Sequence, residues 1–85
     1  MSKEIYDVIV ELLEKKGPVP GGNEMERRDY HYLDAGHLDS FSTIKFILEV
    51  EEAFNIMLAP EDTESVEFRT VNGLINIVER KLKIQ

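Results

Sequence analysis

Residues 36–54 read GHLDSFSTIKFILEVEEAF, and this stretch decides the fold. Asp39 is a favourable N-cap, so we expect a helix that begins at Ser40. Asn55 is expected to end it. The apolar face of this helix is wider than the stripe of a surface helix, which predicts a central helix contacted by several others. Its apolar positions are Phe41, Ile44, Phe46, Ile47, Leu48, Val50 and Phe54.

Apolar residues recur at helical spacing on both sides of this stretch. The pattern predicts a first helix over residues 3–16 and a last helix capped by Thr70. A short helix is predicted around residues 61–68, anchored by Val66 and Phe68. No segment alternates apolar and polar residues with the period of a strand. The chain is therefore predicted to be all-α, a small four-helix bundle of three longer helices and one short one.

Residues 17–39 differ in composition from the predicted helices. Their helix breakers are Pro18, Pro20, Gly21, Gly22 and Asn23. We expect a long loop that Tyr30, Tyr32 and Leu33 hold against the core. A loop of this length in so short a chain usually has a functional reason.

Composition limits the classes of function. The 85 residues are enough for one domain, residues 1–85, and they contain no cysteine, which excludes disulfides, zinc–thiolate sites and a thiol nucleophile. A net charge of -7 argues against nucleic-acid binding. No apolar run is long enough to span a bilayer, and the first residues do not read as a signal peptide, so we expect a cytoplasmic protein.

Negative charge is concentrated in residues 45–67. Lys45 is the one basic residue there, against seven acids: Glu49, Glu51, Glu52, Glu61, Asp62, Glu64 and Glu67. The pattern fits an acidic surface for basic partners, and it fits the solvated faces of two helices equally well.

Ser40 is the residue with the clearest chemical potential. A serine in the first turn of a helix has its hydroxyl near solvent and near backbone N–H groups that lack helical partners. Those groups and the helix dipole favour a phosphate at this position. On position alone, an ordinary first-turn serine is the simpler interpretation.

From about Leu33 to Leu82 the chain resembles the acyl carrier protein family. The matching pieces are Leu38-Asp39-Ser40-Phe41, the helix of residues 42–54, Asn55-Ile56 and Thr70-Val71. The resemblance implies that Ser40 is the attachment point of 4′-phosphopantetheine. It implies that Asp39 caps the helix and helps to place the metal and coenzyme A in the modifying enzyme. The residues implied to contact partners are Phe41, Ile44, Lys45, Glu49, Glu51 and Glu52.

The function implied by the resemblance is covalent carriage without catalysis. The arm would hold an acyl or aminoacyl cargo as a thioester. The partners would be a phosphopantetheinyl transferase and the enzymes that load and accept the cargo, and we expect a monomer. A long acyl chain would need a cleft between the second and third helices, lined by Ile47, Val50, Val66 and Phe68.

Two features depart from typical fatty-acid carriers. His37 and Leu38 separate Gly36 from the Asp-Ser pair, a spacing that resembles D-alanyl carrier proteins and other stand-alone carriers. Lys45 also stands where fatty-acid carriers usually have an acid. The cargo and the pathway therefore stay open.

A hydrolase, a metal site and a cofactor-free interaction module are the alternatives to a carrier. A hydrolase would use Ser40 with His37 or His31 as its base, but the sequence has no Gly-x-Ser-x-Gly elbow. Asp34 and Asp39 with these histidines have no recognised spacing for a metal site, so we expect the histidines to have ordinary surface roles. A helical protein-interaction module without a cofactor remains the alternative, and in such a module Ser40→Ala would leave binding unchanged.

Overall fold

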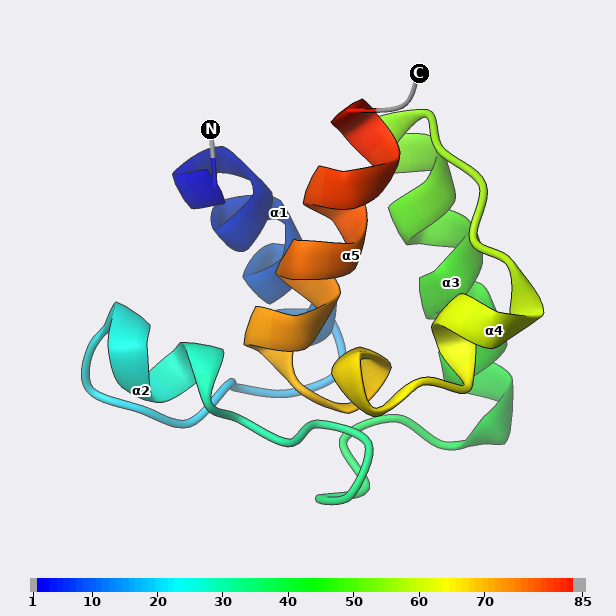
Figure 1. The fold of residues 1–85 in the computed structure, drawn as a ribbon. Coiled ribbons are helices and arrows are strands. Elements are labelled where there is room, and N and C mark those ends of the chain that lie inside the picture. The colour runs from blue at the N-terminus through cyan, green and yellow to red at the C-terminus, as the bar shows by residue number, and fades with distance from the viewer. Residues whose placement is uncertain (1, 84–85) are drawn as a thin grey trace.

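Three long helices form the frame of the protein. The structure, a computed structural model, describes residues 2–83, and all regular secondary structure in that range is helical. The long helices are α1 (Ser2–Glu14), α3 (Ser40–Phe54) and α5 (Val71–Lys83). Helix α1 runs antiparallel to α3 and α5 and packs against both (Figure 1). The prediction of a small all-α bundle is confirmed.

Three short elements complete the fold. They are α2 (Glu24–Arg28), α4 (Pro60–Thr63) and the 3-10 helix η1 (Val66–Arg69). The prediction of a loop throughout residues 17–39 was wrong, because α2 lies within it. The short helix predicted over 61–68 is instead two separate elements joined by a bend.

The core is built around aromatic rings from three parts of the chain. Tyr32 from the long loop packs edge-on against Phe46 of α3 and Phe68 of η1, and all three are fully buried. The Tyr32 hydroxyl donates a hydrogen bond to the Phe68 carbonyl. Burial raises the pKa of Tyr32, so the phenol stays neutral. The expected anchoring of the loop by Tyr32 is confirmed, and Tyr30 and Leu33 pack half-buried beside it.

Side-chain and backbone caps set the helix ends. Asn55 follows α3 with a φ of 55°, and its N–H donates to the Glu51 carbonyl, which confirms the predicted end. The Thr70 hydroxyl accepts a hydrogen bond of 2.9 Å from the Gly73 N–H, which confirms the predicted cap of α5. The first helix ends at Glu14, two residues before its predicted end at residue 16.

Helix α2 is held by polar contacts and not by buried apolar residues. Asn23 caps it by accepting the Glu26 N–H at 2.9 Å. The Arg28 guanidinium donates one hydrogen bond of 2.8 Å to the Glu24 carboxylate and another of 2.8 Å to the side-chain oxygen of Asn72 in α5. The same guanidinium lies 5.5 Å from the centre of the Tyr6 ring of α1. These contacts fasten α2 to α1 and α5.

No helix within residues 2–83 is both long enough and apolar enough to cross a membrane.

Candidate functional site

Ser40 is the first residue of α3 and its side chain is exposed. Asp39 precedes it in an extended conformation, and its Oδ1 accepts the Ser42 N–H at 2.7 Å. The Asp39 carbonyl also accepts hydrogen bonds from the Thr43 N–H and hydroxyl. The predicted N-cap is confirmed, and it leaves the Ser40 hydroxyl at the solvent-exposed end of the helix. In Figure 1 this end lies opposite the start of α1 and the end of α5.

The cap keeps Asp39 ionised. The hydrogen bond from the Ser42 backbone is the largest influence that holds the pKa of Asp39 below its ordinary value, and the positive charge of Lys16 acts in the same direction. Lys16 lies just after the end of α1, so a charge distant in sequence contributes to the electric field at the start of α3.

Within residues 2–83, no hydrogen bond joins Ser40 to His31 or His37. His37 Nδ1 lies 2.8 Å from the Tyr30 hydroxyl, and His37 Nε2 lies 2.8 Å from the Leu13 carbonyl. His31 is exposed and lies 3.6 Å from Asp34. Both His37 nitrogens are therefore engaged away from Ser40. The expectation of an ordinary surface role was wrong for His37, which links the loop to α1.

The exposed face of α3 is apolar near Ser40. Phe41, Ile44 and Leu48 are 74%, 60% and 59% exposed, and they recur at helical spacing along one side. Lys45 and Glu52 are exposed on the same side. Phe41, Ile44 and Leu48 belong to the apolar positions from which a wide core face of this helix was predicted. That prediction was wrong, because these three are exposed and α3 buries only Phe46 and Val50. Leu48 was not among the residues expected to contact partners, although its spacing from Phe41 and Ile44 places it on the same side of the helix.

The sequence aligns with curated carrier proteins over nearly its whole length. A D-alanyl carrier protein of Lactococcus lactis subsp. lactis (strain IL1403) is 32% identical over 82 residues, which are 95% of this chain and 95% of that protein. An acyl carrier protein of Chloroherpeton thalassium is 35% identical over 79 residues, 92% of this chain and 89% of that protein. This chain belongs to the acyl carrier protein family. No family model matches it, and no solved structure matches it.

The acids that the resemblance singled out have different surroundings in this member of the family. Glu49 forms an ion pair of 3.4 Å with Lys15, and Glu51 accepts the Leu58 N–H at 2.7 Å. Glu52 is exposed and forms no ion pair with any residue in 2–83. Two of the three carboxylates therefore contact other parts of their own chain.

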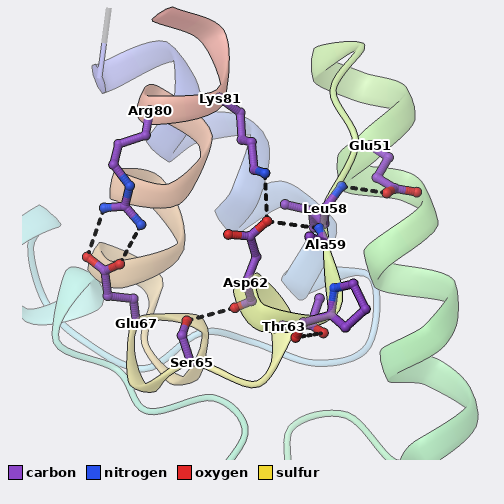
Figure 2. A network of polar contacts seen from close by, with 10 residues as sticks. Glu51, Leu58, Ala59, Asp62, Thr63, Ser65, Glu67, Arg80 and Lys81 are labelled. Carbon is purple, nitrogen blue, oxygen red and sulfur yellow. Dashed lines mark hydrogen bonds and ion pairs between the residues drawn. The ribbon is translucent and has the colours of Figure 1, made fainter. Parts of the chain in front are cut away.

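A network of polar contacts joins α4 and η1 to α5 (Figure 2). Lys81 forms a 2.7 Å ion pair with Asp62, and Asp62 also accepts the Ala59 N–H at 2.8 Å. Arg80 forms two hydrogen bonds to Glu67. Burial alone would raise the pKa of Asp62, but the hydrogen bonds from Lys81 and Ala59 outweigh it and hold the pKa below its ordinary value. Hydrogen bonds from Arg80 lower the pKa of Glu67.

The four residues expected to line a cleft do not share one environment. Val50 and Phe68 are fully buried and Ile47 is half-buried, whereas Val66 is 81% exposed. Val66 therefore lies at the surface, whereas Val50 and Phe68 lie in the core. A shallow apolar cavity of about 260 Å³ lies elsewhere, between α1 and α5. It is lined by Ile5, Glu79, Leu82 and Lys83.

Proposed function

We propose that this chain is a carrier protein whose Ser40 bears a 4′-phosphopantetheine arm. The observation that carries the proposal is an exposed serine hydroxyl at the first position of a capped helix, in a chain of the acyl carrier protein family. When attached, the arm supplies a thiol that holds an acyl or aminoacyl cargo as a thioester.

The residues around Ser40 fit such a group. The Ser42 and Thr43 amides are engaged by Asp39, and the Phe41 amide also lies close to the Asp39 carboxylate. As in any helix, the amides of this first turn have no partners within the helix. These donors and the positive end of the α3 dipole favour a phosphodiester on the Ser40 oxygen. The hydroxyl is exposed, so a modifying enzyme can reach it without moving the core.

Transfer of the arm to Ser40 requires a base from the modifying enzyme. The Ser40 oxygen would bond the phosphorus of the phosphopantetheine group, and adenosine 3′,5′-bisphosphate would leave from coenzyme A. The hydroxyl proton needs an acceptor, and both ring nitrogens of His37 are already hydrogen-bonded. On this proposal the chain is a substrate of a phosphopantetheinyl transferase and not itself a catalyst.

The face of α3 beside Ser40 is the proposed partner surface. Any enzyme that reaches Ser40 must approach the first turns of α3, where Phe41, Ile44 and Lys45 are exposed. Glu52 extends this surface with a free carboxylate, whereas Glu51 is half-buried against Leu58. The surface therefore combines apolar contact with a few charges, a mixture suited to brief encounters with several partners.

The test is the intact mass of the protein after incubation with coenzyme A, Mg²⁺ and a broad-specificity phosphopantetheinyl transferase. The expected result is a gain of one phosphopantetheine in the wild type and in Ser42→Ala, and no gain in Ser40→Ala. Circular dichroism shows that each variant is folded. No gain in a folded wild type, with a known carrier modified in a parallel reaction, would favour a cofactor-free interaction module.

A further inference from the structure

His37 joins two parts of the chain that are far apart in sequence. Its ring lies between the Tyr30 hydroxyl of the long loop and the Leu13 carbonyl near the end of α1, each at 2.8 Å. The Tyr30 and His37 rings also meet edge-on, with centres 5.4 Å apart. The side chain is half-buried, so water competes only partly for these contacts.

The chemistry of the two partners fixes the tautomer of His37. A carbonyl oxygen can only accept, so the hydrogen in the contact with Leu13 is carried by His37 Nε2. Neutral imidazole has a single N–H, which leaves Nδ1 as the acceptor for the Tyr30 O–H. Within residues 2–83, no carboxylate lies within ion-pair distance of this ring. The bridge is therefore complete in the neutral Nε2–H form.

The backbone around His37 also contacts the rest of the fold. The His37 N–H donates to the Tyr32 carbonyl at 3.0 Å, and the next residue, Leu38, is buried in the core. Asp39 then caps α3. The segment that leads into Ser40 is thus fixed to α1 by the His37 ring and to the core by Leu38.

We propose that His37 is a positioning residue for Ser40. By joining Leu13 and Tyr30 it holds the loop so that Asp39 and Ser40 stay in place at the start of α3. The effect of His37 on transfer of the arm rests on the proposed function of Ser40. Its effect on the order of the first turn of α3 does not depend on that function. Loss of the bridge lowers the fraction of molecules that present Ser40 ready for docking, and the apparent affinity falls with that fraction.

The first test measures local order without any modifying enzyme. In His37→Phe, which keeps a ring but no nitrogen, amide exchange at Ser42 and Thr43 should speed up about thirtyfold, because the loss of two hydrogen bonds of about 1 kcal/mol each amounts to about 2 kcal/mol. Tyr30→Phe removes one of the two bonds and should give a smaller increase. Imidazole ¹⁵N spectra of the wild type should show a protonated Nε2 and an unprotonated Nδ1. Unchanged exchange in both variants, or a proton on Nδ1, would overturn the proposal.

The second test separates positioning from general destabilisation. The KM of a phosphopantetheinyl transferase for His37→Phe should rise about three- to tenfold with kcat unchanged. Ile77→Val, which lies in the α5 part of the core, should lower stability with no change in KM. His31→Phe, at an exposed position, controls for the substitution itself. If KM rises equally in Ile77→Val, His37 acts only through stability. An unmodified wild type would instead contradict the proposed function, and the exchange data would still decide the role of His37.

Discussion

Ser40 and His37 lie three residues apart and have opposite environments. The Ser40 side chain is exposed, whereas both His37 nitrogens are hydrogen-bonded within the chain. A serine nucleophile of a hydrolase needs an oriented base within reach, and this histidine is committed elsewhere. Ser40 and His37 therefore do not have the arrangement that a serine hydrolase needs.

Gly73 marks the closest approach of α5 to η1. A Cβ atom at this position would lie 2.0 Å from the Glu67 carbonyl oxygen, so Gly73→Ala must displace backbone. We expect the free energy of unfolding to fall by about 1–3 kcal/mol, as in other overpacked sites. Urea denaturation of the variant and the wild type measures the change.

Gly17→Ala is the matched control for this prediction. A Cβ at Gly17 would meet nothing within 4 Å, so its effect on stability should stay within about 0.5 kcal/mol. Equal stability of Gly73→Ala and Gly17→Ala would show that the contact between α5 and η1 relaxes freely.

Among the elements, α4 depends on polar contacts for its position. None of its residues is buried, and Asp62 connects it to Lys81 of α5. The Ser65 hydroxyl bonds the Asp62 carbonyl at 2.7 Å, and Glu67 of η1 pairs with Arg80 (Figure 2). Helix α3, by contrast, is held by Phe46 and Val50 in the core. Burial of apolar side chains therefore positions α3, whereas hydrogen bonds and ion pairs position α4.

Lys81→Gln should loosen α4 selectively. The Asp62–Lys81 pair is partly shielded, and we expect its loss to cost roughly 0.5–1 kcal/mol. Hydrogen–deuterium exchange should rise in residues 59–65 and stay unchanged in α1. Lys83→Gln, the same charge change at an exposed site on α5, is the control. Equal exchange in the two variants would contradict a specific role of the ion pair.

The same carboxylates predict the response to acid. The pKa values of Asp62 and Glu67 are lowered in the folded state. Their contribution to stability is therefore fully present above the ordinary carboxyl pKa of roughly 4 and is lost as the pH falls through the folded values. Lys81→Gln should accordingly differ from the wild type at neutral pH and converge with it in strong acid.

In the molecule as a whole, the sequence predicted what local patterns control. Helical periodicity and capping residues placed the three long helices, with Asp39, Asn55 and Thr70 at their ends. The sequence did not predict α2, because Glu24–Arg28 buries no side chain and the residues of α5 and α1 that contact it are distant in sequence. Periodicity has no means of detecting such a helix.

In the predicted site too, local sequence determines some features and tertiary contacts determine the others. The position of Ser40 after an Asp cap follows from local sequence, and the structure has that geometry. The bridge from His37 to Leu13 spans 24 residues, and the contact of Glu49 with Lys15 spans 34. Which polar groups are used inside the fold, and which remain for partners, depends on such tertiary contacts. Local patterns alone could not decide between an acidic partner surface and internally paired acids.

The most direct test of Ser40 as the carrier residue is peptide fragmentation of the transferase-modified protein. Trypsin cleavage after Arg28 and Lys45 releases residues 29–45, which contain Ser40, Ser42 and Thr43. We predict that the fragment spectrum places one phosphopantetheine on Ser40 and none on the other two hydroxyls. An arm on Ser42 or Thr43, or an unmodified peptide from a reaction that modifies a known carrier, would contradict the assignment.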